Sequence, residues 1–163
     1  MKKIVIIVSL FLCAAVAYSQ TADEYYEKGN EQLIAHNYRE AIIYYTKAIE
    51  LDDEYKEAYN KRGTARAALE EYRMAIADYT KVLELNPDEV LTYTNRGYIF
   101  SLLKDYQSAL ADITKALELD PKFPLAYLNR GNIRKSQGES RLALSDYDKT
   151  IELDSSFIAA YYN

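Results

Sequence analysis

The sequence predicts an all-α superhelix, a solenoid built from one helix–turn–helix unit that is repeated along the chain. Residues of the same type recur every 34 positions over most of the 163 residues. A period of this length is typical of one supersecondary unit whose copies bury their apolar faces against each other. The residues that keep the period include four glycines and four alanines: Gly29, Gly63, Gly97, Gly131, Ala41, Ala75, Ala109 and Ala143.

The first 19 residues form a separate segment that is typical of a secretory signal peptide. Lys2 and Lys3 precede an apolar run of 14 residues from Ile4 to Ala17, and small residues follow at the spacing of an export-peptidase site. We expect cleavage after Ala17 or after Ser19. The run is shorter than the roughly 20 residues of a membrane-spanning helix, and an uncleaved anchor is the alternative. The protein is therefore expected in the periplasm, at the cell surface or in the surroundings of a bacterium.

The composition of the remaining chain argues against nucleic-acid binding. The only cysteine of the sequence, Cys13, falls within the signal segment. We therefore expect no disulfide in the remaining chain and a fold held by packing. After residue 19, 18 basic and 25 acidic residues leave a formal charge of −7. Binding to a phosphate backbone needs a basic surface, which this balance does not provide.

Four complete units are expected, at residues 22–55, 56–89, 90–123 and 124–157, and residues 158–163 begin a fifth. The first half of the third unit carries two apolar stripes, which predicts a helix packed between its own partner and the adjacent unit. The second half of each unit is a plainer amphipathic helix. In the second unit the apolar residues at i, i+3, i+4 and i+7 spacing are Tyr72, Ala75, Ile76, Tyr79, Val82 and Leu83.

Prolines and acidic residues mark the ends of the second helices. Asn86-Pro87 and Asp120-Pro121 stop a helix, because a residue before proline avoids the α region. The acidic segment 52–54 lacks the alternating oxygen ligands and the central glycine of a calcium loop. We therefore expect helix termini at these places and no metal site.

The glycines predict a close approach of the two helices in each unit. Glycine inside a helix costs about 1 kcal/mol relative to alanine, so four copies at one place need a structural reason. We expect each glycine to lie against the second helix where a small alanine faces it, as with Gly97 and Ala109. The same contact brings Arg96 near Asp112, which predicts an Arg–Asp pair within units two to four. The rival pairing joins Asp78 to Arg96 of the next unit.

With these elements the sequence resembles the tetratricopeptide repeat family. Tyrosine stands where many members carry tryptophan. The resemblance implies a right-handed stack of helix hairpins whose first helices line a concave groove for peptides or extended segments of partner proteins. It does not identify the partner. The matching residues are Tyr59, Gly63, Tyr72, Ala75, Tyr79 and Pro87 in unit two, and Tyr93, Gly97, Tyr106, Ala109, Ile113 and Pro121 in unit three.

In such a groove, the exposed side chains are those of the first helices that lie outside both apolar stripes. These side chains are charged in unit one and become apolar and amide-rich toward unit four. Asparagine can pair with a peptide backbone as donor and acceptor, and leucine or tyrosine can anchor apolar side chains. For Leu91 and Leu125 the alternative is packing against neighbouring loops. The predicted peptide-binding residues are Asn60, Thr64, Leu91, Asn95, Tyr98, Leu125, Leu128, Asn129 and Asn132.

One subgroup of the family grips a C-terminal carboxylate with paired lysines and asparagines in this groove. Asn30 could match one asparagine of that clamp. Tyr26 replaces its lysine, Lys61 replaces the second asparagine, and Leu91 replaces the next lysine. The clamp is therefore absent, and the sequence does not support binding of chaperone tails.

The sequence contains no pattern typical of an enzyme. The single histidine, His36, is expected in the solvated turn between the helices of unit one. No metal-ligand cluster, nucleophile–base pair or phosphate-binding glycine loop occurs. We therefore expect no catalytic residue, no metal, no cofactor and no small-molecule substrate.

The sequence reaches only one turn into the fifth unit. Residues 160–163 repeat the pattern of residues 126–129, and the apolar residues that would lack a complete neighbour are Leu144, Ile151, Phe157 and Ile158. Two interpretations stay open. Either the chain is part of a longer protein, or the open end is an interface for end-to-end self-association or for a larger envelope assembly.

Overall fold

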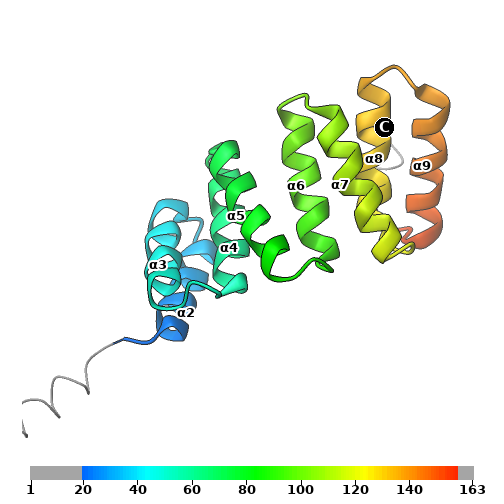
Figure 1. Ribbon diagram of the computed structural model, residues 1–163. Coiled ribbons are helices and arrows are strands. Elements are labelled where there is room, and N and C mark those ends of the chain that lie inside the picture. Colours follow the sequence, from blue (N-terminus) through cyan, green and yellow to red (C-terminus); the bar gives the residue numbers. More distant parts are fainter. Residues whose placement is uncertain (1–19, 158–163) are drawn as a thin grey trace, which may run out of the picture.

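The computed structural model describes residues 20–157, and within this range the chain forms eight α-helices and no β-strand (Figure 1). The predicted all-α superhelix is confirmed. The expected signal segment and the start of the fifth unit lie outside the described residues. The helices are α2 (Ala22–Ile34), α3 (Tyr38–Leu51), α4 (Lys56–Ala68), α5 (Tyr72–Leu85), α6 (Val90–Leu102), α7 (Tyr106–Leu119), α8 (Pro124–Ser136) and α9 (Ser140–Leu153).

The helices form four pairs that lie side by side in a row from α2 to α9 (Figure 1). Each helix packs against its partner, and the second helix of a pair also packs against the first helix of the next pair. Small side chains lie between adjacent pairs, since Ala58, Ala65 and Ala126 are fully buried. The first helices of the inner pairs are thus covered on two sides, as their two apolar stripes predict.

The turn inside each pair contains one residue with left-handed backbone geometry. His36, Glu70, Lys104 and Gly138 have φ values of 60°, 61°, 62° and 82°. Glycine adopts this geometry at the lowest steric cost. The fifth glycine, Gly138, therefore also lies at a position that recurs every 34 residues. The other three units have a larger residue there, in the same left-handed geometry. His36 is exposed there, and its Nδ1 lies 2.9 Å from the Tyr38 hydroxyl.

Each second helix ends at an Asp or Asn whose side chain caps the following turn. The Oδ1 atom accepts the backbone N–H two residues further on, at 2.9 to 3.2 Å. This turn occurs with or without a following proline, so the side chain and not the proline is common to all four units. The capping residues are Asp52, Asn86, Asp120 and Asp154.

The close approach at the glycines is confirmed, but the alanines are not the main neighbours. A Cβ atom on Gly29 would lie 2.5 Å from the ring of Tyr45, and one on Gly131 would lie 2.5 Å from the ring of Tyr147. Helical side chains lean toward the N-terminus of their helix. Tyr45 therefore covers the turn that contains Ala41, and its ring fills the space that the sequence analysis assigned to the alanine.

At Gly97 the neighbours are different, because the third unit carries isoleucine where the others carry tyrosine. A Cβ atom on Gly97 would lie 3.0 Å from Ile113 Cδ1 and 3.1 Å from the backbone oxygen of Ala109. Here the sequence-based expectation of contact with the alanine turn is correct. The contact is looser than at Gly29.

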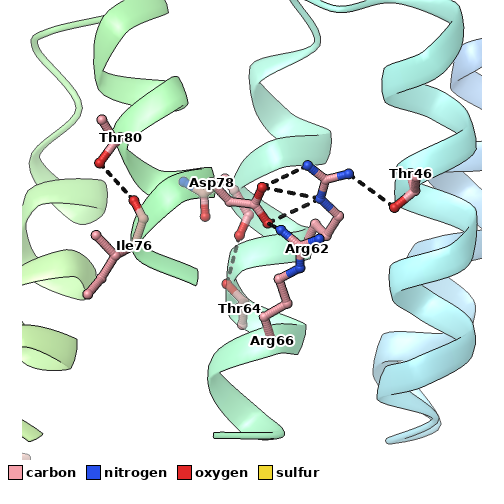
Figure 2. Close-up of polar contacts among 8 residues, drawn as sticks. Thr46, Arg62, Thr64, Arg66, Ile76, Asp78 and Thr80 are labelled. Carbon is pink, nitrogen blue, oxygen red and sulfur yellow. Dashed lines mark hydrogen bonds and ion pairs between the residues drawn. The ribbon is translucent and has the colours of Figure 1, made fainter. Parts of the chain in front are cut away.

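The predicted Arg–Asp pairs form within units two to four. Each arginine of the two inner pairs also reaches the preceding unit, and Figure 2 shows this for Arg62. The Arg62 Nη2 atom donates to Asp78 Oδ1 at 2.7 Å, and Nη1 donates to Thr46 Oγ1 on α3 at 3.0 Å. The Arg96 guanidinium does the same with Asp112 and Thr80. The rival pairing of Asp78 with Arg96 is not formed. One guanidinium therefore ties two adjacent helix pairs together.

The three aspartates do not carry the same number of arginines. Asp78 also accepts a 2.7 Å hydrogen bond from Arg66 Nη1, whereas Phe100 occupies the equivalent place in unit three. Among the described residues, Asp112 therefore forms an ion pair with Arg96 and with no second arginine. The hydrogen bonds between the two side chains raise the pKa of Arg96, and burial opposes this effect. The exposed fraction of the Asp78 side chain is 3%. Removing this carboxylate would leave two guanidinium groups without their counter-charge.

We expect Gly29→Ala to destabilise the fold more than Gly97→Ala. The added methyl group would lie 2.5 Å from the buried Tyr45 ring in the first case, whereas in the second its nearest neighbours, Ile113 Cδ1 and the backbone oxygen of Ala109, are 3.0 and 3.1 Å away, so that less has to move. Overpacking costs about 1–3 kcal/mol, and the gain in helix propensity is about 1 kcal/mol. Thermal unfolding of the two variants measures the order. A higher midpoint for Gly29→Ala than for the wild type would contradict the close contact.

We expect Asp78→Ala to lower the free energy of unfolding by about 3–5 kcal/mol, the range for breaking a buried ion pair. Asp112→Ala should cost less, because it leaves one unpaired arginine instead of two. The control is Glu118→Ala, which removes an exposed pair with Lys115 and should change stability by about 0–1 kcal/mol. Denaturant titration compares the three variants. A change of a few tenths for Asp78→Ala would show that the network does not stabilise the array.

Candidate functional site

Two of the hollows on the first helices lie between α4 and α6. We call the surface formed by the outward side chains of α2, α4, α6 and α8 the first-helix face. The first hollow has a volume of about 260 Å³ and is lined by Tyr26, Lys56, Glu57, Asn60, Lys61, Val82, Glu89 and Leu91. The second has a volume of about 390 Å³ and is lined by Thr64, Ala67, Ala68, Glu70, Tyr72, Tyr79, Asn95, Tyr98, Ile99 and Leu102.

Charged side chains take part in lining the first hollow, and most of these charges are paired within the protein. Lys56 Nζ lies 3.0 Å from Glu89 Oε1 and 3.7 Å from Glu57 Oε1. The hydrogen bond to Glu89 raises the pKa of Lys56. Asn60 Nδ2 donates to Thr92 Oγ1 at 2.8 Å and so links α4 to α6. This hollow offers a firm polar wall with little free charge.

The second hollow is lined by both apolar and polar side chains and has one large and one small wall. On α6, Tyr98 and Leu102 are 46% and 42% exposed. On α4, the facing residues Ala67 and Ala68 are small. Space remains because no large α4 side chain fills the gap beside the two exposed α6 side chains.

The structure brings five of the nine predicted binding residues to these hollows. Asn60 and Leu91 line the first hollow, and Thr64, Asn95 and Tyr98 line the second. The side chain of Leu91 is 48% exposed, which favours an open surface over packing against a loop. Whether these residues bind a partner stays a prediction.

The four predicted residues of α8 do not line these hollows. Leu125 is half-buried against the core, and Asn132 Oδ1 accepts a hydrogen bond from the Tyr147 hydroxyl at 3.0 Å. Leu128 and Asn129 are each 8% exposed. The prediction of an open groove side chain is wrong for Leu128, which packs beside Ala143 and Tyr147 in the core of the last pair, and for Asn129, which is equally buried. For Leu125 and Asn132 a role in binding stays a prediction.

Several residues that line the hollows were not predicted from the sequence. Among them, Leu102 is the one that the helical spacing indicates most clearly. Leu91, Asn95, Tyr98 and Leu102 are spaced i, i+4, i+7 and i+11, so they lie on one face of α6. Extending the predicted stripe by one turn would have found Leu102. Ala67 and Ala68 could not be found in this way, because they contribute space and not contact.

The described residues offer no site for metal chemistry. Within residues 20–157 no group of three His, Cys, Asp or Glu side chains could hold a metal ion. The same part of the chain contains no helix that is long and apolar enough to cross a membrane.

Sequence profiles described as tetratricopeptide repeat match residues 22–55, residues 57–89 with 90–123, and residues 113–145. The chain belongs to the tetratricopeptide repeat family. The predicted membership is thus confirmed, and with it the helix-pair solenoid. No curated protein sequence matches this tetratricopeptide repeat protein.

Solved structures of the same fold include a domain with a bound peptide. The crystal structure of MamA protein is 25% identical with a TM-score of 0.78, covering 86% of this chain and 76% of MamA. The first repeat domain of Spaghetti (RPAP3), bound to the HSP90 peptide SRMEEVD, is 28% identical with a TM-score of 0.70, covering 74% and 95%. The repeat domain of OM64 from Arabidopsis is 29% identical with a TM-score of 0.69, covering 71% and 96%. The fold is therefore that of a protein-interaction module.

Proposed function

We propose that this tetratricopeptide repeat protein is a non-enzymatic module that binds a peptide or an extended protein segment in a groove along the first-helix face. The observation that carries the proposal is the pair of hollows between α4 and α6, beside the exposed Leu91, Tyr98 and Leu102. Large apolar side chains that gather on one surface mark interaction sites more often than scattered ones do. Rigid helices hold these side chains in place before binding.

Asn95 is suited to hold the backbone of such a segment. Its side chain is half-buried between Leu91 and Tyr98 on α6, and no hydrogen bond to it is formed by the described residues. By contrast, the amides of Asn30, Asn60 and Asn132 are engaged within the protein. The free amide can donate to and accept from one peptide unit of a bound chain.

A second candidate function is that of a structural element in an envelope assembly, and α9 favours it. Leu144 is 59% exposed, whereas its counterparts in the other units, Ile42, Ile76 and Leu110, are half-buried. The opposite end is polar, because Glu24 and Glu31 of α2 stand where the inner pairs bury Ala58 and Ala65.

This polar end opposes head-to-tail stacking of two copies. Such stacking would desolvate both glutamates against apolar side chains of α9, which is costly. An assembly through α9 would then use a different partner. Sedimentation over a range of concentrations checks this, and we expect no head-to-tail oligomers. Concentration-dependent growth of open chains would contradict it.

We expect a photo-crosslinking amino acid at Tyr98 or Leu91 to capture a partner protein from cell-envelope extract. The same amino acid at Ile43 or Met74, which are 54% exposed on second helices, is the matched control and should capture none. Mass spectrometry of the crosslinked product identifies the partner and the contact site. Equal capture from both sets of positions would contradict binding at the first-helix face.

We also propose that the protein is exported to the periplasm, cell surface or surroundings of a bacterium, on the basis of the segment from Lys2 to Ala17. Mass spectrometry of protein recovered from the exported fraction should give an N-terminus at Tyr18 or Gln20. Recovery of the complete chain in the membrane fraction would instead support an uncleaved anchor.

A further inference from the structure

The third unit differs from the others by an exchange between its two helices. In units one and four, a buried second-helix tyrosine donates from its hydroxyl to an asparagine of the first helix: Tyr45 to Asn30, and Tyr147 to Asn132, both at 3.0 Å. In unit two the corresponding hydroxyls, of Tyr79 and Thr64, are 3.4 Å apart. The tyrosine of each of these units is used inside its own helix pair.

In unit three the tyrosine lies on the first helix instead. Ile113 takes the buried place on α7 and is fully buried, and Tyr98 takes the place of the asparagine on α6. An isoleucine cannot hydrogen-bond, so no second-helix hydroxyl holds Tyr98 in its own pair. Tyr98 is 46% exposed on the first-helix face as a result.

The neighbouring unit leaves room for a guest beside Tyr98. At the two positions that face it, α4 has Ala67 and Ala68, whereas the equivalent positions of α2 are Leu33 and Ile34. The hollow of about 390 Å³ between α4 and α6 is thus bounded by small side chains on one side and by Tyr98 and Leu102 on the other. This combination suits a single large apolar side chain.

The charge of unit one, on the far side of α4 from Tyr98, indicates which residues flank that apolar side chain in a bound segment. On the first-helix face of α2, the exposed carboxylates of Asp23 and Glu27 stand where α6 has Leu91 and Asn95, and the whole chain has a formal charge of −5. An acidic surface attracts basic segments and repels acidic ones.

We propose that unit three is the recognition unit of the groove and that its partner is an extended segment with one large apolar residue flanked on one side by basic residues. The apolar side chain occupies the hollow beside Tyr98 and Leu102, and the basic residues lie over α2. The proposal rests on the proposed function, since it specifies the chemistry of the segment that the first-helix face would bind. A neutral or acidic ligand, or a second copy of the chain, is the competing outcome.

The test uses short, end-blocked fluorescent peptides and measures binding to the purified protein by anisotropy. A central Leu, Phe or Ser is combined with flanking lysines, serines or glutamates. We expect the Leu and Phe peptides with lysines to bind tightest. Replacement of the central residue by Ser should weaken binding by about tenfold or more, as expected for a central anchor. Replacement of the lysines should weaken binding and reduce its dependence on salt.

Two sets of protein variants assign the effect to the second hollow. Tyr98→Ser and Leu102→Ser should each weaken the preferred peptide by about tenfold or more, and Met74→Ser, at an exposed place on α5, should not. The double variant Tyr98→Asn with Ile113→Tyr restores the arrangement of units one and four. It should keep the helix content measured by circular dichroism and lose the preference for a large apolar residue.

The results separate this proposal from the proposed function. If serine or glutamate peptides bind best and groove variants abolish their binding, the module binds peptides but this inference is overturned. If no peptide binds, or if Tyr98→Ser has no effect on the preferred peptide, unit three is not the recognition unit. If binding persists in every groove variant and crosslinks form equally on the second helices, both proposals are overturned.

Discussion

The contact between a glycine of the first helix and a bulky side chain of the second is the constraint on which the rest of the array depends. The ring of Tyr45 lies 2.5 Å from the place of a Cβ atom on Gly29, so the two helices pack more closely than alanine would permit. Close packing within each pair fixes which side of the first helix is buried. The opposite side is left to form a surface, and the residues that we propose for binding lie there.

A second interaction joins the pairs to each other. The guanidinium of Arg62 binds Asp78 of its own pair and Thr46 of the preceding one, so a single planar group with several donors serves both. Unit one has no preceding pair among the described residues. There Tyr25 stacks on Tyr44 with ring centroids 6.5 Å apart, and Lys47 lies over the Tyr25 ring. The array is thus coupled through polar groups inside and ends in a polar helix at α2.

Function in a repeat protein comes from departures from the repeat, because positions that keep the pattern serve packing. The exchange that places Ile113 in the core and Tyr98 on the surface changes no helix, yet it gives one unit an aromatic side chain that the others keep buried. The small residues of α4 turn that side chain into one wall of a hollow. Two units are therefore needed to build one site, and a change in either would alter it.

The sequence by itself determined the helix pairs, the close approach at the glycines and the Arg–Asp pairing, because a fixed period and helical spacing are local properties. It also identified Asn95 and Tyr98 as surface residues. The tertiary structure decided that Leu128 is core and that Tyr45, not Ala41, meets Gly29. It alone placed the hollow beside Tyr98, since a hollow depends on the size of side chains that a neighbouring repeat contributes from far away in the sequence.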